Sequence, residues 1–343
     1  MKALVLKKYM HLVYEDVPDP TYIPDEVLIE VKACGICGSD VHGMDGSTGR
    51  RIPPVIMGHE ASGVIREVGS DVKNWNEGDR VTFDSTVYSL DDWYTQKGLY
   101  NLGDNRQVLG VSCDEFKRNG AFAEYVVVPQ HILHKIPDSV SFNQAAMTEP
   151  VAVAMHAINL TPISEGDVAL VVGVGMIGLF VVQILKLIGC SKVIAVDVST
   201  NQLKMAKKFG ADLELNFDRY DILEKIHRHT DNRGADIAIE AVGTTPTINA
   251  AIEGVRKGGV VTLIGNLSKE VELPLQSVVT RQIRLQGSCA IAGEYPEVLK
   301  LIGEGKINVN DMLSAAAPLS EGSEWFNRLY KKEPGLMKVI LNP

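Results

Sequence analysis

The chain has 343 residues, of which 45% are apolar and 22% are charged, and its formal net charge is −9 at pH 7. Because ordinary domains hold about 100 to 200 residues, two domains are expected. The composition is that of a globular enzyme, and the acidic balance disfavours nucleic acid or an anionic membrane as partner, since each requires a concentrated basic surface.

The N-terminus and the longest apolar run indicate a cytoplasmic protein. Four apolar residues, 3–6, separate the first lysine from the next two, too few for a secretory signal. The apolar run 168–182 is shorter than the ~18 residues of a membrane span. Five cysteines without an export signal predict free thiols rather than a disulfide framework. We expect the partner to be a small molecule.

The first 150 residues, approximately, are typical of a β-rich domain. Short runs of strand character lie at 26–33, 61–69 and 120–129, separated by Gly, Pro and Asp clusters.

From about residue 166 the pattern alternates between strands and helices. Buried strands are expected at 167–175 and 192–199, and amphipathic helices follow them at 176–189 and 200–210. This alternation predicts a parallel sheet with crossover helices.

The alternation continues to about residue 288, with strands expected at 235–243 and 258–266 and a helix at 247–259. The last part differs, because 294–306 and 321–332 predict helices. Residues 336–343 predict a final strand that can return the chain to its first domain.

Gly173, Gly175 and Gly178 form a G-x-G-x-x-G motif between an expected strand and helix. The first glycine permits a tight turn, the second allows the backbone to approach a pyrophosphate, and the third lets helix pack on strand. The motif encloses Met176 and Ile177, where the helix N-terminus offers N–H donors to phosphate. Glycines that serve packing alone are the alternative.

Asp197 stands at the end of the next expected strand, where a carboxylate accepts hydrogen bonds from ribose hydroxyls and repels a 2′-phosphate. The following residues bring no arginine, so NAD is favoured over NADP, although Lys204 and a serine nearby keep the second cofactor open. A turn or helix-capping role is the alternative for Asp197.

Cys37 and His59 combine with a carboxylate, from Glu60 or Glu149, into a mixed ligand set suited to zinc. Three protein ligands leave the open position of a catalytic site. A structural zinc or a redox pair at Cys34 and Cys37 is disfavoured, because no second cysteine pair and no preceding βαβ unit accompany them. Taken alone, an ordinary histidine and a surface glutamate remain the stronger interpretations of His59 and Glu60.

The stretch 58–72, GHEASGVIREVGSDV, resembles the zinc-containing alcohol dehydrogenase signature of the medium-chain dehydrogenase/reductase superfamily. The stretch CGICGSDVH and the glycine motif agree with it, and the resemblance covers essentially the whole chain. Glu149 followed by Pro150 resembles the sorbitol, L-iditol and threonine dehydrogenase branches.

This resemblance implies an α/β fold in which a Rossmann doubly wound parallel sheet is inserted into a GroES-like β-rich catalytic domain. We expect the catalytic domain at 1–152 and 290–343 and the Rossmann domain at 153–289. The resemblance places the active site in the cleft between them.

The resemblance also implies how the reaction proceeds. Zinc held by Cys37, His59 and a glutamate acts as a Lewis acid on the alcohol, and hydride passes to NAD⁺. Ser39 and His42 match the hydroxyl and imidazole that carry the alcohol proton to solvent. Glu60 and Glu149 are left unranked as direct ligand and supporting group.

A departure from the family concerns its second, structural zinc. The four cysteine positions of that lobe are occupied here by Ser89, Asp92, Thr95 and Gly103, so one zinc per chain is expected. We expect the lobe to be held by packing of apolar side chains or by another subunit, with partial disorder as the alternative. The apolar side chains are Leu90, Trp93, Tyr94, Leu99 and Tyr100.

The leading hypothesis is an NAD-dependent zinc enzyme that oxidises a polyol or secondary alcohol to a ketose or ketone. Arg50 and Arg51 keep open a sugar-alcohol phosphate dehydrogenase and an L-threonine 3-dehydrogenase, since they can meet a phosphate or carboxylate. The zinc-free quinone reductase branch is disfavoured by Cys37, His59 and Asp197. A nucleotide-binding protein without catalysis is the non-enzyme alternative. Edge strands within 271–288 predict a homodimer or homotetramer.

Overall fold

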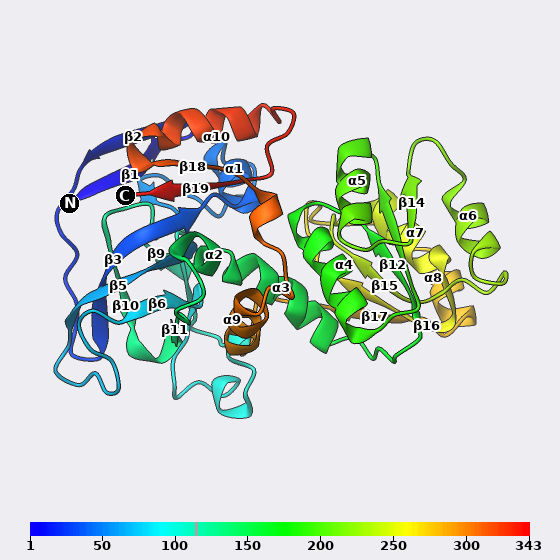
Figure 1. Cartoon of the computed structure of the whole chain (residues 1–343), viewed down its shortest axis with the longest axis horizontal. Coiled ribbons are helices and arrows are strands. Elements are labelled where there is room, and N and C mark those ends of the chain that lie inside the picture. The colour runs from blue at the N-terminus through cyan, green and yellow to red at the C-terminus, as the bar shows by residue number, and fades with distance from the viewer. Residues whose placement is uncertain (114–115) are drawn as a thin grey trace. The chain divides into compact units, whose positions relative to one another are not determined.

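The computed structural model describes residues 1–113 and 116–343, and it consists of two compact units. The first unit comprises Met1–Glu149 and Ile291–Pro343, and the second comprises Pro150–Ala290. A parallel α/β unit therefore interrupts a β-rich unit, as the sequence predicts, and both chain termini belong to the β-rich unit (Figure 1).

The main sheet of the first unit is largely antiparallel, with β18 and β19 as a parallel pair. In sheet order its strands are β11 (Leu133–Lys135), β6 (Arg80–Phe83), β5 (Glu60–Val68), β3 (Glu26–Gly35), β19 (Lys338–Asn342) and β18 (Leu313–Pro318), and β10 (Tyr125–Pro129) also pairs with β3. Alternate residues of β3, such as Val27, Ile29 and Val31, are buried in the core, as the period of a strand requires.

Two small sheets and several helices complete this unit. The small sheets are β2 (His11–Asp16), β1 (Lys2–Lys8) and β4 (Val55–Ile56), and β7 (Thr86–Val87), β8 (Gln107–Leu109) and β9 (Lys117–Arg118). The helices are α1 (Gly38–Met44), α2 (Phe142–Ala146), α9 (Tyr295–Gly303) and α10 (Gly322–Tyr330), with 3₁₀ turns at Thr95–Lys97, Tyr100–Leu102, Gln130–Ile132, Asn310–Met312 and Leu319–Glu321.

Helix α10 shows how the C-terminal segment joins the core of the first unit. Phe326 on its inner face is fully buried, and its ring meets Phe122 edge-on with centroids 5.5 Å apart. Burial of such a side chain contributes about 2 to 3 kcal/mol. The segment is therefore part of the core rather than an appendage.

The second unit is a six-stranded parallel sheet, entered through α3 (Thr148–Asn159). Its order is β14 (Leu213–Asn216), β13 (Lys192–Asp197), β12 (Val168–Val172), β15 (Ala235–Glu240), β16 (Val255–Leu263) and β17 (Arg284–Gly287). The connecting helices are α4 (Met176–Ile188), α5 (Thr200–Lys208), α6 (Ile222–Arg228), α7 (Thr245–Gly254) and α8 (Leu275–Thr280).

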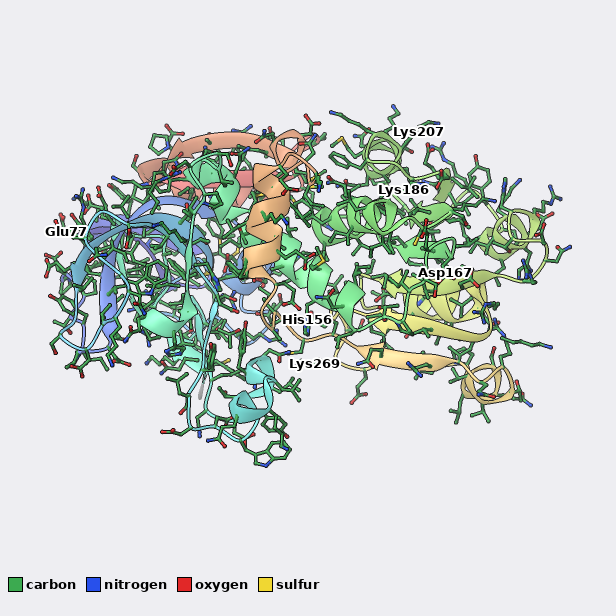
Figure 2. The ribbon with its side chains drawn as sticks, turned by 60° about the horizontal axis from the view of Figure 1, so that its bottom comes forward. Glu77, His156, Asp167, Lys186, Lys207 and Lys269 are labelled. Carbon is green, nitrogen blue, oxygen red and sulfur yellow. The ribbon has the colours of Figure 1, made fainter. Side chains whose placement is uncertain are left out.

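The strand order reverses between β12 and β15, so the sheet has the doubly wound topology expected from the sequence. Right-handed crossovers then place α4 and α5 on one face and α6 and α7 on the other, which agrees with the packing of α4 on α5 and of α6 on α7. Lys186, near the end of α4 and labelled in Figure 2, lies 3.1 Å from the Asp212 carboxylate that precedes β14.

Two expected elements differ from the structure. The helix expected at 247–259 ends at Gly254, and strand β16 begins at Val255. The segment 271–288 contributes a short helix, Leu275–Thr280, before the edge strand Arg284–Gly287. Within the described residues, no helix combines the length and apolar character that a bilayer span requires.

Candidate metal centre and nucleotide site

The pairing of β3 with β5 brings the predicted metal ligands together. The antiparallel register places Gly35, the last residue of β3, opposite Glu60, the first residue of β5. Cys37 follows β3 by two residues and His59 directly precedes β5. Residues more than twenty positions apart thus meet at one end of the sheet, because antiparallel neighbours run in opposite directions.

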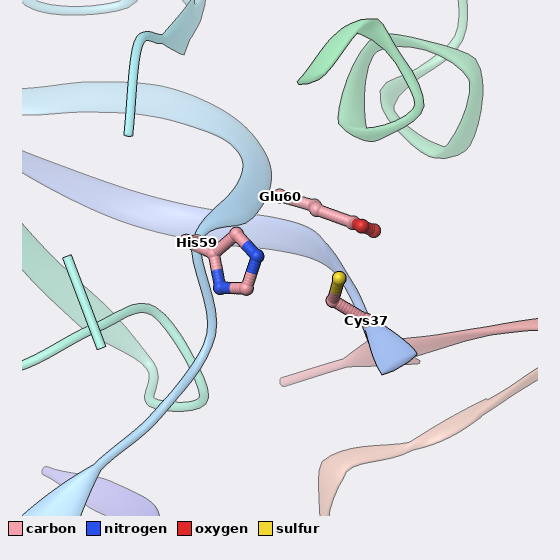
Figure 3. Close-up of side chains that lie close together, drawn as sticks. All are labelled: Cys37, His59 and Glu60. Carbon is pink, nitrogen blue, oxygen red and sulfur yellow. The ribbon is translucent and has the colours of Figure 1, made fainter. Parts of the chain in front are cut away.

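Cys37, His59 and Glu60 form a cluster whose ligand atoms all lie within 4.8 Å of one another. His59 and Glu60 are buried and Cys37 is partly exposed. Figure 3 shows the sulfur, one ring nitrogen and the carboxylate oxygens directed into one space. A thiolate, an imidazole and a carboxylate are ligands that zinc accepts, and three of them leave a position for substrate.

Gly35 is required for this arrangement. A Cβ atom at residue 35 would lie 2.3 Å from Oε2 of Glu60, well inside van der Waals contact. The absence of a side chain therefore makes the space that the Glu60 carboxylate fills.

Lys338 is the counter-charge of Glu60, and sequence reasoning did not identify it. Its Nζ lies 2.5 Å from Oε2 of Glu60 and donates a second hydrogen bond to the carbonyl of Ile36 at 3.1 Å. Both side chains of the pair are buried. Burial opposes the charge of Lys338, but the neighbouring Glu60 raises the pKa of Lys338 above its usual value. Its strand, β19, pairs with β3 opposite Gly35.

The Asp40 side chain contacts two of the three cluster residues, Cys37 and His59. Its Oδ2 accepts a hydrogen bond from the Cys37 backbone N–H at 3.3 Å, and its Oδ1 lies 3.5 Å from Nδ1 of His59. Although burial opposes ionisation, the charges of His59 and Arg51 lower the pKa of Asp40. Asp40 and Cys37 in turn raise the pKa of His59 against the effect of burial.

The negative charges of Asp40 and Cys37 beside the His59 ring would also attract a cation. Nδ1 of His59 is buried without a regular hydrogen bond and faces Asp40. The other ring nitrogen is therefore the one on the side of Cys37 and Glu60 in Figure 3. A carboxylate behind the ring is the usual support of a metal-binding histidine.

Glu149, the other predicted carboxylate, lies in the first turn of α3 and is buried. Its Oε1 accepts a long hydrogen bond of 3.5 Å from the Ser85 hydroxyl. Burial, with a smaller effect of repulsion from Glu60, raises the pKa of Glu149 to about 7. Its oxygens are not in the cluster formed with Cys37 and His59.

Ser39 and His42 lie on α1, three residues apart, so they share one face of the helix. Both are exposed. The Ser39 hydroxyl accepts a hydrogen bond from Nη2 of Arg51 at 3.3 Å. Cys37 is the N-cap of α1, so the two predicted relay residues lie on the helix that begins at a metal-cluster residue.

The two arginines considered as substrate contacts differ from each other. Arg50 is exposed. Arg51 is only 3% exposed, and its guanidinium donates to the Asp40 carboxylate at 2.9 Å. Arg51 is thus bound inside the fold, so the expectation that it meets a substrate phosphate or carboxylate is wrong.

The lobe at 89–103, for which the resemblance implies a lost zinc site, is organised by Asp92, which occupies one of the four expected cysteine positions. Its carboxylate accepts hydrogen bonds from the backbone N–H groups of Tyr94, Thr95 and Asp104, at 2.8, 3.2 and 3.1 Å. Tyr100 stacks on Tyr88 with centroids 4.2 Å apart. The aspartate therefore closes the lobe through backbone amides.

Packing holds the lobe in part. Tyr100 is half-buried and its hydroxyl donates to Asp84 at 3.0 Å. Leu90 and Trp93, however, are 60% and 61% exposed. These two side chains are therefore not packed within the chain, and contact with another subunit, the other expectation for the lobe, stays a prediction.

The glycine motif of the second unit has the geometry of a phosphate-binding turn. Gly173 has a φ of +86°, and a Cβ atom on Gly178 would lie 2.0 Å from the Gly173 carbonyl oxygen. Gly175 is the N-cap of α4, and a Cβ atom there would meet nothing within 4 Å. The first and third glycines serve the fold, and the second leaves an open cradle at the helix N-terminus, beside Met176 and Ile177.

Asp197 ends β13 at the same edge of the sheet. Its Oδ2 accepts a hydrogen bond from the Val174 N–H at 2.9 Å, and its Oδ1 accepts one from the Ser199 N–H at 2.8 Å. These bonds fix the carboxylate beside the glycine turn while each oxygen keeps a further lone pair for a ribose hydroxyl.

Comparison with known proteins agrees with both sites. The family model for the alcohol dehydrogenase GroES-like domain matches residues 23–138, and that for zinc-binding dehydrogenases matches residues 176–304. Sorbitol dehydrogenase from Halalkalibacterium halodurans is 35% identical over 351 residues, which cover 100% of this chain and 99% of the relative.

D-Arabitol-phosphate dehydrogenase from Enterococcus avium is 32% identical over 340 residues, covering 98% of this chain and 95% of the relative. A solved zinc-binding dehydrogenase from Sinorhizobium meliloti 1021, bound to NADP, has a TM-score of 0.90 at 30% identity and covers 100% of this chain and 99% of its own.

The chain belongs to the zinc-dependent alcohol dehydrogenases of the medium-chain dehydrogenase/reductase superfamily. Within that family it is a sorbitol dehydrogenase-like enzyme that uses zinc and NAD(H). The predicted fold class, a Rossmann sheet inserted into a GroES-like catalytic domain, is confirmed.

Proposed function

We propose that this enzyme oxidises a polyol or secondary alcohol to a ketose or ketone, with NAD⁺ as the oxidant and one zinc held by Cys37, His59 and Glu60. The convergence of these three side chains within 4.8 Å is the observation that carries the proposal. The names of the sorbitol and D-arabitol-phosphate relatives support the polyol class. When bound, zinc supplies Lewis acidity toward the alcohol oxygen, and NAD⁺ supplies the hydride acceptor.

The side chains in and around the cluster have separate proposed roles in metal binding and proton transfer. Glu60 is the carboxylate in the cluster, so we assign it as the direct ligand and Glu149 as the supporting group. Ser39 accepts the proton of the alcohol, and the exposed His42 on the same helix face passes a proton to water.

In the second unit, the cradle at Gly175 receives the pyrophosphate against the N-terminus of α4. Gly173 and Gly178 maintain the turn, and the fixed Asp197 carboxylate accepts the ribose hydroxyls. A 2′-phosphate would meet this negative charge, which supports NAD over NADP.

A phosphorylated polyol is the second candidate substrate, because one relative is named for such a substrate. Of the two arginines in the loop before His59, Arg50 is the exposed one, so it is the residue of that pair available to a phosphate. L-Threonine remains a third candidate through its secondary alcohol.

The test combines elemental analysis with a screen for NAD⁺ and NADP⁺ reduction. The substrates are xylitol, sorbitol, L-iditol, D-arabitol phosphate, galactitol phosphate, L-threonine and simple secondary alcohols. We expect one zinc per chain and NAD⁺ reduction with a polyol. Cys37→Ser should lose zinc and activity, whereas Cys113→Ser, a thiol outside the cluster, should keep both. Protein that binds NADH but neither metal nor any alcohol would be a nucleotide-binding protein without catalysis.

Assembly and location are part of the same proposal. The edge strand β17 offers unpaired backbone groups for a two-fold contact between copies, which supports a homodimer or homotetramer, measurable by light scattering. All five cysteines lie within the described residues and none of them forms a disulfide, which supports a reducing cytoplasm. With a net charge of −9, neither nucleic acid nor a membrane is a proposed partner.

A further inference from the structure

Arg51 makes an unusual set of contacts for a loop arginine. It is 3% exposed, and it donates from Nε and Nη2 to the same oxygen, Oδ1 of Asp40, at 3.3 and 2.9 Å. Nη2 also donates to the hydroxyl of Ser39 at 3.3 Å. One guanidinium therefore spans two neighbouring residues of α1.

The partner of Arg51 is itself bound to the metal cluster. Asp40 is fully buried, its Oδ2 accepts the backbone N–H of Cys37 at 3.3 Å, and its Oδ1 lies 3.5 Å from Nδ1 of His59. A single carboxylate thus contacts the main chain of one cluster residue and the ring of another, and Arg51 donates to the oxygen that faces the ring.

We propose that Arg51 is a positioning residue that holds Asp40 behind the His59 ring and Ser39 at the start of the proton path. Arg51 thereby fixes the orientation of the His59 ring, by way of Asp40, and the orientation of the Ser39 hydroxyl. The inference rests on the proposed function, because it takes Cys37 and His59 as ligands and Ser39 as a relay group. Support of this kind behind a ligating histidine commonly changes metal affinity 10- to 100-fold, approximately.

The fold provides a dedicated place for the side chain. A Cβ atom on Gly43 of α1 would lie 2.3 Å from Cγ of Arg51 and 3.2 Å from its Cβ. The methylene stem of Arg51 therefore occupies the space that a side chain at 43 would need. Even Gly43→Ala would push the guanidinium away from Asp40 without removing any charge.

The chemistry requires arginine rather than positive charge alone. Asp40 and Ser39 are reached simultaneously because the guanidinium carries several N–H groups in a fixed plane. A lysine ammonium is a single point donor and cannot reproduce this fork. Arg51→Lys thus keeps the charge beside Asp40 and loses the geometry.

The test compares Arg51→Lys and Gly43→Ala with wild type and with Arg66→Lys, which makes the same change at an exposed arginine outside the cluster. Zinc affinity is measured by competition with a chelator, and the visible spectrum of the cobalt(II)-substituted protein reports the geometry of thiolate and imidazole ligation. Steady-state kinetics are then taken at saturating zinc.

We expect Arg51→Lys and Gly43→Ala to weaken zinc binding about 10- to 100-fold, to change the cobalt spectrum and to lower kcat, with the KM for NAD⁺ unchanged. Arg66→Lys should match wild type. A role limited to stability would lower the unfolding temperature but leave the cobalt spectrum unchanged, which would overturn the inference.

The failures of the two proposals are distinguishable. Wild-type zinc affinity and kcat in both Arg51→Lys and Gly43→Ala would overturn the inference and leave the proposed function intact. Wild-type protein that binds no zinc would overturn both. If Arg51→Lys does not fold, the result for Gly43→Ala tests the inference, because that variant keeps the Arg51 guanidinium and only displaces it.

Discussion

Asp84 is a buried carboxyl group in the first unit, only 1% exposed. It accepts hydrogen bonds from the Tyr100 hydroxyl at 3.0 Å and from the Thr86 N–H at 2.8 Å. Burial nevertheless raises the pKa of Asp84 to about 7. In the unfolded chain an aspartate ionises near pH 4. Between about pH 4 and 7 the folded state therefore holds a proton that the unfolded state releases, so stability falls as the pH rises.

Asp84→Asn should remove this pH dependence, because asparagine keeps an acceptor oxygen and cannot ionise. Relative to wild type, the variant should gain about 2.7 kcal/mol of stability between pH 5 and pH 8, because about two pH units of that range lie below the folded pKa of about 7 and each contributes about 1.36 kcal/mol. The measurement is the midpoint of thermal unfolding at both pH values with EDTA present. Asp138→Asn, at an exposed position, is the control. A difference from wild type that is the same at both pH values would contradict the prediction.

At the residue scale, sequence reasoning identifies groups whose chemistry is local and misses those defined by burial. Cys37, His59 and Glu60 could be named because their types and spacing match a family motif. Lys338 could not, since its partner lies 278 positions away and the pair is created by the strand register. The sequence suggests Arg51 as a contact for a substrate phosphate or carboxylate, because nothing around it indicates that Asp40 is a buried acceptor for its guanidinium.

In the turn between β12 and α4, one glycine of the motif is needed for packing and another for the proposed binding of phosphate. Gly178 packs against the backbone of Gly173, whereas the space at Gly175 is open. The two positions are only three residues apart, so substitutions there provide a matched pair.

Gly178→Ala should destabilise the second unit, because its methyl group would overlap a carbonyl oxygen at 2.0 Å. Gly175→Ala should keep the wild-type unfolding temperature but lose affinity for NADH at least tenfold, since the methyl group fills the proposed phosphate cradle, a loss of about 1.4 kcal/mol. Thermal unfolding and NADH fluorescence titration measure the two effects. Full NADH affinity in Gly175→Ala would contradict the cradle.

At the element scale, periodicity predicts the parallel sheet and its helices well, because both faces of each strand are buried. It predicts the end of α7 poorly, because the sequence after Gly254 continues a helical pattern while pairing with β15 draws Val255 into β16. The conformation of the 89–103 lobe could not be predicted from periodicity either. It depends on hydrogen bonds that backbone N–H groups donate to the Asp92 carboxylate.

At the scale of the whole chain, the first unit is built from both ends of the sequence. Lys338→Met should leave the buried Glu60 carboxylate unpaired in metal-free protein, which costs about 3 to 5 kcal/mol for a buried pair. Added zinc should recover part of this loss, because a cation beside Glu60 replaces the missing charge. Calorimetry with EDTA and with zinc measures both values.

Lys331→Met, at an exposed position, should unfold like wild type in both conditions. An equal loss of stability with and without zinc in Lys338→Met would contradict a shared cation site at Glu60.

The late position of Lys338 has a consequence for biosynthesis. A ribosome that has completed Glu60 must add 278 further residues before the ammonium group exists, which takes about 14 to 56 seconds at 5 to 20 residues per second. During that interval the nucleotide unit is synthesised, and the nascent chain displays an acidic, thiol-bearing segment that lacks its counter-charge. The ion pair that neutralises Glu60 therefore forms only after every residue of the nucleotide unit has been added.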